Sequence, residues 1–216
     1  VEVNGQIATI GMSIDPEVDR VFVEGVKLKG VVEDKVVLAM NKPKGILCTN
    51  SDPFDGKTVF EILPSPYDEM KLFCCGRLDK NSTGLVILTN DGDMANKITH
   101  PSSGIIKRYR VLINRDVDDA VIKTLLRGVV SDGEKLKASK ILRPAHEKTS
   151  FPLRRLEIWL NQGRKREIRR MFEVMGLFVK ELKRFQVGGY EMKKIPQGGC
   201  IKLTKAEIAR LMKSGS

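Results

Sequence analysis

A polar segment between two apolar stretches carries the residues best suited to nucleophilic or acid–base chemistry. It runs from Gly76 to Gly84 and places Asp79 between Arg77 and Lys80. Neighbouring cations keep a carboxylate ionised, as a nucleophile or a general base requires. A loop held between buried elements is also where a rigid scaffold positions reactive groups. An aspartate that only caps a turn would show the same pattern.

A second segment, residues 164–170, is strongly basic. At about 100° per residue, a helix here would place Arg166 and Arg170 together, opposite the apolar face. Arg169 would lie on the flank of that face, where it could turn inward and pair with a carboxylate. The other two arginines would face solvent or a phosphate, so the segment predicts either nucleic-acid contact or an ordinary solvated face.

Two further segments could contact a nucleotide. In the alternating strand that contains residues 107–113, Tyr109 shares the inward face with Val111. It is either a core tyrosine or an aromatic platform for a splayed-out base. Lys42 and Lys44 flank a proline in a polar loop, which is either a phosphate-binding loop or a plain turn.

Strands and helices are intermixed around these segments without regular βαβ alternation. Apolar or alternating runs predict strands, and apolar residues at helical spacing with capping signals predict helices. The predicted strands are 36–40, 85–89, 108–113 and 156–160, and the predicted helices are 58–63, 93–99, 118–127, 164–175 and one that starts at Thr204. Asp93 is the expected N-cap of the second helix. The pattern favours an α+β fold with a mixed, largely antiparallel sheet.

The composition indicates a polyanionic partner. The 216 residues include 38 Lys and Arg against 27 Asp and Glu, a net charge of +11, which favours nucleic acid. The four cysteines have no zinc-ligand spacing and indicate a reduced, cytoplasmic protein. No apolar run approaches the roughly 20 residues of a membrane span, and no signal sequence opens the chain. Because the chain begins at Val1, we expect that an N-terminal piece is missing.

Other chemistries have weaker signals. Asp91 and Asp93 could ligate Mg²⁺ in a phosphoryl-transfer enzyme, but no third acidic residue lies nearby in the sequence. Lys57 lacks the upstream glycines of a P-loop. A cysteine nucleophile at Cys74 or Cys75 is disfavoured because both lie in an apolar run.

Taken together, these segments resemble a pseudouridine synthase of the branch that modifies ribosomal RNA and carries an N-terminal S4 domain. The resemblance covers nearly the whole chain. Its motifs, in order, are Asn41-Lys42-Pro43-Lys44-Gly45, Gly76-Arg77-Leu78-Asp79 with Thr83-Gly84-Leu85, Lys107-Arg108-Tyr109-Arg110-Val111, the run from Gly163 to Met171, and Leu182-Lys183-Arg184.

The resemblance implies roles for individual residues. Asp79 would be the catalytic carboxylate, which either attacks the nucleotide or removes a sugar proton. Arg169 would pair with Asp79, and Tyr109 would stack on the target uracil. The residues implied in substrate or RNA binding are Lys42, Lys44, Arg77, Lys107, Arg164, Arg166, Arg170 and Leu182. The reaction is an isomerisation that needs no metal and no organic cofactor.

The same resemblance implies the organisation and the partner. Residues 1–31 would be the strand-rich remnant of an S4-like RNA-binding domain, and residues 32–216 the catalytic domain. The partner would be ribosomal RNA, with the large subunit favoured, and the protein would act as a monomer. The alternative is a non-catalytic RNA-binding or ribosome-assembly factor, which would keep the basic helix and lack the chemistry.

Overall fold

The computed structural model describes residues 1–15, 18–28, 34–49, 56–143 and 153–214. The chain divides into two compact units, Val1–Lys35 and Val36–Ser216. The boundary predicted between residues 31 and 32 lies outside the described residues.

The first unit is a small antiparallel sheet in the order β2-β1-β3-β4, and Val3 and Val21 are its buried apolar residues. Its strands are β1 (Glu2–Val3), β2 (Gln6–Ile7), β3 (Val21–Val23) and β4 (Val26–Lys27). Asn4 and Gly5 both have positive φ, 52° and 83°, as a tight two-residue hairpin requires.

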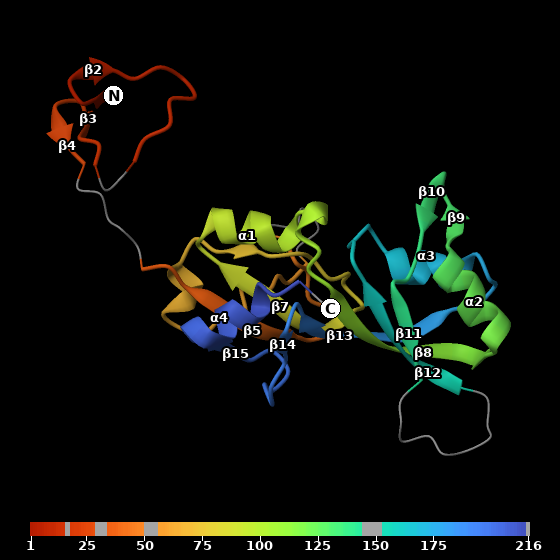
Figure 1. Cartoon of the computed structure of the whole chain (residues 1–216). Helices are drawn as coiled ribbons and strands as arrows, with labels where there is room; N and C mark the ends of the chain where they lie inside the picture. Colours follow the sequence, from red (N-terminus) through yellow and green to blue (C-terminus); the bar gives the residue numbers. More distant parts are fainter. Residues whose placement is uncertain (16–17, 29–33, 50–55, 144–152, 215–216) are drawn as a thin grey trace. The chain divides into compact units, whose positions relative to one another are not determined.

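The second unit is built on one mixed sheet in the order β11-β12-β8-β13-β7-β5-β15, with β14 beside β13 and β6 beside β7 (Figure 1). Its pairs are antiparallel except for β13 with β7, which is parallel. The strands are β5 (Val37–Lys42), β6 (Phe73–Cys74), β7 (Thr83–Thr89), β8 (Lys107–Val117), β11 (Lys140–Leu142), β12 (Leu153–Leu160), β13 (Val179–Val187), β14 (Tyr190–Glu191) and β15 (Cys200–Lys202). A separate hairpin consists of β9 (Val129–Ser131) and β10 (Glu134–Leu136).

Helices flank both halves of this sheet. Helices α1 (Gly92–Thr99) and α4 (Lys205–Leu211) lie beside the half that contains β5 and β7, whereas α2 (Asp119–Arg127) and α3 (Glu167–Glu173) lie beside the half that contains β8 and β12 (Figure 1). Single 3-10 turns are η1 (Tyr67–Glu69) and η2 (Pro101–Ser103). The predicted capping box of α4 is present.

Two of the helix predictions are corrected. Residues 58–63 form no helix, because Thr58 pairs with Leu47 in an isolated β-bridge. Helix α1 begins earlier than expected, and its N-cap is Asp91, whose carboxylate accepts the Met94 N–H at 3.1 Å. Asp93 is instead an acidic residue of the first turn.

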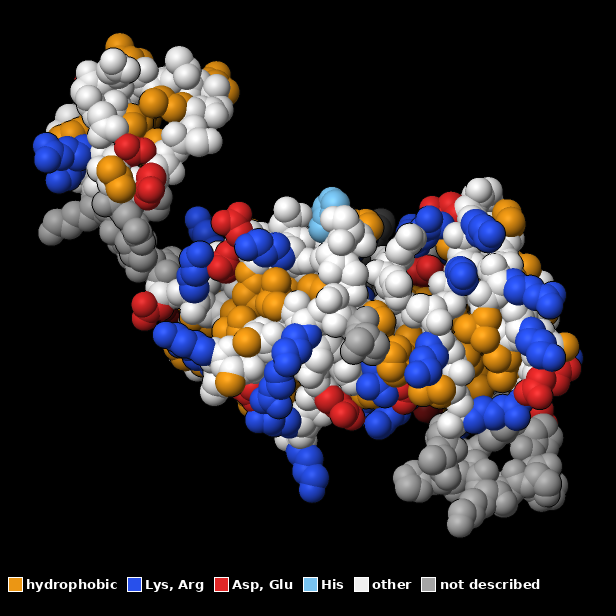
Figure 2. Space-filling model, viewed as in Figure 1, with side chains coloured by type: hydrophobic (Ala, Val, Ile, Leu, Met, Phe, Trp, Pro, Cys, Tyr) orange, Lys and Arg blue, Asp and Glu red, His pale blue; other side chains and the backbone are white. Residues whose placement is uncertain are grey.

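The centre of the sheet is buried on both faces. Strand β5 is buried at every position, as its continuous apolar run predicts. Leu38 and Met40 belong to one hydrophobic cluster, and Val37 and Ala39 belong to another on the opposite face. Lys and Arg side chains are spread over the visible face of the second unit rather than gathered in one patch (Figure 2).

Candidate active site

One cavity of about 680 Å³ brings together residues from four distant segments of the chain. It lies where the loop before β7, strands β8 and β13 and the start of α3 meet. The predicted site residues that line it are Arg77, Asp79, Lys107, Tyr109, Arg164, Arg166 and Leu182.

Asp79 and Arg169 form an ion pair beside this cavity. Asp79 Oδ2 lies 3.6 Å from Arg169 Nε, and the side chains are 31% and 11% exposed. Arg169 also donates from Nη1 to the Val179 carbonyl at 2.9 Å and from Nη2 to Ser82 Oγ at 3.4 Å. The prediction that Arg169 turns inward to a carboxylate agrees with this geometry. The guanidinium places a positive charge beside the Asp79 carboxylate.

Among the described residues, the Arg169 Nε–H has no hydrogen-bond acceptor, because 3.6 Å is too long for a bond to Asp79. The Asp79 carboxylate is therefore held by charge and not locked by a short hydrogen bond. Catalytic contacts are often long before substrate binds and tighten in the complex.

Arg184 supports the loop that carries Asp79, and the sequence motif did not assign it a role. Its side chain is 3% exposed and donates to three carbonyl oxygens: Leu85 at 2.7 Å, Gly76 at 3.2 Å and Arg77 at 3.4 Å. These bonds tie both ends of the loop to β13. The available signal was the spacing of Arg184 from Leu182, two residues apart on one strand and hence on one face.

Lys107 and Tyr109 point into the cavity from β8. They are 8% and 7% exposed, and the alternation along the strand places them on the inward face, as predicted for Tyr109. Burial, together with the positive charge of Arg184, lowers the pKa of Lys107 to about 8, and Glu167 partly opposes the shift. Lys107 is thus a cation at neutral pH that loses its proton more readily than a surface lysine.

The Lys42 side chain does not have the RNA-binding role that was predicted for it. Its side chain is fully buried, and Nζ donates to the carbonyl oxygens of Pro43, Ile46 and Lys80 at 3.0, 2.6 and 3.3 Å. All three of its donors have protein acceptors. Lys42 therefore links two loops of the protein, and an RNA contact by its ammonium group does not fit the structure. Lys44 is exposed but lies outside this cavity.

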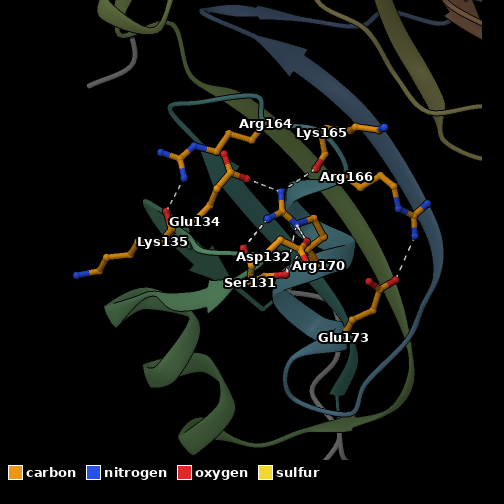
Figure 3. Close-up of polar contacts among 9 residues, drawn as sticks. All are labelled: Ser131, Asp132, Glu134, Lys135, Arg164, Lys165, Arg166, Arg170 and Glu173. Carbon is orange, nitrogen blue, oxygen red and sulfur yellow. Dashed lines mark hydrogen bonds and ion pairs between the residues drawn. The ribbon is translucent and has the colours of Figure 1, made fainter.

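Arg170 also differs from the prediction, as Figure 3 shows. Its guanidinium is 13% exposed and bridges to the β9–β10 hairpin, with Glu134 Oε2 at 2.6 Å, Asp132 Oδ2 at 3.1 Å and the Ser131 carbonyl at 2.6 Å. Two carboxylates neutralise it within the protein. Arg170 fixes the hairpin against α3 and does not offer its charge to solvent or a phosphate.

The expected adjacency of Arg166 and Arg170 fails because Arg166 is not helical. It is the N-cap of α3 in the left-handed conformation, with φ 53°, so the helical spacing does not apply to it. Arg166 pairs with Glu173 at 3.1 Å, and both side chains remain nearly half exposed (Figure 3). Such a pair is weak and is easily exchanged for a phosphate. Arg164 donates to the Lys135 carbonyl at 2.7 Å and is partly exposed.

Other chemistries gain no support from the described residues. Among them, no group of three or more His, Cys, Asp and Glu is placed to hold a metal ion. Burial raises the pKa of Cys75 to about 12, which disfavours its thiolate. In the part of the chain that the structure describes, no helix has the length and apolar character needed to cross a membrane.

Comparison with known proteins gives consistent matches. Residues 36–174 match the family described as RNA pseudouridylate synthase. The chain is 32% identical over 212 residues to ribosomal large subunit pseudouridine synthase B of Vibrio cholerae, covering 96% of this chain and 65% of that protein. It is 35% identical over 217 residues to an uncharacterized RNA pseudouridine synthase of Aquifex aeolicus, covering 99% and 84%.

A solved structure extends the likeness to the fold. A crystal structure of a pseudouridylate synthase aligns with a TM-score of 0.74 at 28% identity, covering 97% of this chain and 87% of that one. The predicted α+β fold class is confirmed by this match. The chain spans slightly less than two thirds of the length of the Vibrio relative.

Proposed function

Because this chain belongs to the RNA pseudouridylate synthase family, we propose that it converts a uridine of ribosomal RNA to pseudouridine, with Asp79 as the catalytic carboxylate. The observation that carries the proposal is the Asp79–Arg169 pair at the edge of the 680 Å³ cavity. Large-subunit RNA is the favoured substrate, since the Vibrio relative is named for it.

The reaction requires an ionised carboxylate at the sugar–base junction. The N1–C1′ bond of uridine breaks, the uracil turns, a C5–C1′ bond forms, the C5 proton leaves and N1 takes up a proton. Asp79 serves either by attacking the nucleotide or by removing a sugar proton, and both routes begin with the anion. Arg169 maintains that anion and orients it, as a charge partner in a largely buried setting does.

The remaining cavity residues hold the nucleotide. Tyr109 supplies a ring on which the uracil stacks, and Leu182 supplies an apolar wall. The cations that face the cavity and contact the RNA backbone are Arg77, Lys107, Arg164 and Arg166, with Lys44 outside it. Because a stacked base cannot reach Asp79, the target uridine lies in a loop or flips out.

The organisation of the chain is part of the same proposal. The first unit is the S4-like RNA-binding part and the second is the catalytic part. Every side chain proposed for catalysis comes from the second unit of one chain, which supports a monomer as the active form.

The direct test is release of tritium from ribosomal RNA labelled at C5 of uridine. Asp79→Asn removes the anion and keeps the shape, so release should fall to background while RNA binding persists. The matched control is Asp93→Asn, an exposed residue of α1, which should release tritium at the wild-type rate. Full activity of Asp79→Asn would end the proposal.

Two other outcomes identify the alternatives. RNA binding by the wild-type protein without any tritium release would indicate a non-catalytic RNA-binding or assembly factor. Loss of activity in excess chelator, together with loss in Asp93→Asn, would indicate metal-dependent chemistry at Asp91 and Asp93.

A further inference from the structure

A second groove, of about 960 Å³, lies on the side of β8 and β12 that points away from the catalytic cavity. Side chains alternate along a strand, and Lys107 and Tyr109 line the first cavity while Arg110 and Leu112 line the second, together with Val111 between them. On β12, Arg155 and Glu157 line this groove in the same way. We call it the basic groove.

The charge of the basic groove is not balanced within the protein. Its cations are Lys44, Arg110, Arg155, Lys180 and Lys183, and its carboxylates are Glu157 and Glu181. The catalytic cavity has the same balance, with the five cations Arg77, Lys107, Arg164, Arg166 and Arg184 against Asp79 and Glu167. A concave surface with this excess attracts a polyanion and concentrates it.

The carboxylates of the basic groove do little to neutralise its cations. Glu157 Oε1 already accepts from Arg108 Nη2 at 2.5 Å and from Trp159 Nε1 at 2.6 Å. Among the described residues, Lys183 and Arg155 form no ion pair and both are exposed. Their charges are therefore available to a ligand from outside.

Arg110 is held in place for such a ligand. Its guanidinium lies 4.5 Å from the centre of the Phe185 ring, and its side chain is still 63% exposed. The nearest carboxylate, on Glu191, is 3.8 Å away and equally exposed, so it is a weak competitor. An arginine stacked on a buried ring loses less freedom when it binds a phosphate.

The basic groove adjoins the catalytic cavity across one short loop. Asp79 and Ser82 line the catalytic cavity, whereas Asn81 and Thr83 of the same loop line the groove. Leu182 lines both. An RNA strand with one nucleotide at Asp79 therefore has a short path over this loop to the basic groove.

We propose that the basic groove is a second RNA-binding surface, which holds phosphates that flank the target uridine on the side of the sheet away from Asp79. The inference rests on the proposed function, because it takes the RNA to be the same molecule that enters the catalytic cavity. It also gives exposed Lys44 a place in RNA binding that the catalytic cavity does not.

The test is the salt dependence of binding to a large-subunit ribosomal RNA transcript between 50 and 200 mM KCl. The variant is Arg155→Gln with Lys183→Gln, which removes two groove cations on the exposed side of the sheet. Each lost phosphate contact lowers the slope of log K against log salt by about 0.7 to 0.9. The slope should therefore fall by about 1.4 to 1.8, and in tritium release KM should rise while kcat holds.

The matched control removes one arginine and one lysine elsewhere. Lys123→Gln with Arg127→Gln, both exposed on α2, should leave the slope and KM unchanged. An unchanged slope for the groove variant, or an equal fall in the control, would overturn the inference.

Failure of the groove and failure of the proposed function can be told apart. If the wild-type protein releases no tritium but the groove variant still lowers the slope, the isomerase proposal fails and the groove stands. If tritium is released and the groove variant binds with the wild-type slope, the groove fails and the isomerase proposal stands.

Discussion

Replacing Gly84 with alanine should destabilise the second unit and disturb the catalytic loop. Gly84 is paired with Arg184 across the parallel β7–β13 contact, and its φ is +100°. A Cβ added at Gly84 would lie 2.1 Å from the Arg184 carbonyl oxygen and 3.0 Å from its carbonyl carbon. These are backbone atoms of the neighbouring strand, so no side-chain rotation relieves the contact.

The magnitude follows from two costs and one gain. An L side chain at a strained positive φ costs about 1 to 3 kcal/mol. Overpacking a tightly packed site costs about 1 to 3 kcal/mol more. The lower chain entropy of alanine in the unfolded state returns about 0.4 to 1 kcal/mol. The net loss of stability is about 1 to 5.6 kcal/mol, and each kcal/mol lowers Tm by roughly 2 to 4 °C in a chain of this size.

Function should suffer beyond the loss of stability. Moving the Arg184 backbone also moves the guanidinium that binds the carbonyl groups of Gly76 and Arg77, three and two residues before Asp79. At a temperature well below its Tm, Gly84→Ala should therefore release tritium more slowly than the wild-type protein.

The assay is thermal and urea unfolding followed by circular dichroism, with Gly92→Ala as the matched control. Gly92 is the first residue of α1, has no strained φ and has nothing within 4 Å of an added Cβ. Its replacement should leave stability unchanged or slightly raised. If Gly84→Ala unfolds within about 0.5 kcal/mol of the wild-type protein, the range of ordinary surface substitutions, the contact argument is refuted.

Arg169→Ala should lower kcat on the order of 100-fold, because it removes the charge beside Asp79. Arg169→Lys keeps a positive charge and should restore part of the loss. Equal losses in both variants would contradict a role based on charge. Arg170→Ala should lower stability in urea unfolding because it removes the contacts that hold the β9–β10 hairpin against α3, while the salt slope of RNA binding stays unchanged. Arg166→Ala, at an exposed residue of the catalytic cavity, should do the reverse and lower the slope by about 0.8. Lys107 binds its proton less tightly in the folded state, with a pKa of about 8 against an ordinary 10.5, so its contribution raises folding stability as pH rises from 8 towards 10.5. Lys107→Met should lack this rise and be the more stable protein at pH 7; a stability difference that is independent of pH would argue against the lowered pKa.

Local sequence patterns predicted the structure correctly where the outcome depends on a single helix or strand. The buried run at 36–40 predicted a strand covered on both faces, and β5 is buried throughout. The Thr204–Glu207 pair predicted the start of α4, because a capping box is complete within four residues. The alternation around Tyr109 predicted its inward side chain for the same reason.

Helix boundaries were less well determined. The apolar spacing at 164–175 predicted a longer helix than α3, which spans Glu167–Glu173. The left-handed Arg166 ends the periodicity at its start. Because Arg166 lies outside the helix, it does not share a helical face with Arg170, and the expected basic face is not formed.

The fold class and the segments that meet at the site were both predicted from the sequence. The motifs around Asp79, Tyr109 and Arg169 were visible as residue types at short spacing. These signals can be read from the sequence because hydrophobic periodicity and capping depend on neighbours within a few residues.

The role of each cation followed from the three-dimensional packing. Lys42 is buried on three carbonyl groups, Arg170 is neutralised by a hairpin about forty residues earlier, and Arg184 supports a loop about a hundred residues earlier. Lys44 lines the basic groove and not the catalytic cavity. The reason is that the state of a charged side chain depends on its desolvation and its partners, and strand order, not sequence distance, brings those partners together.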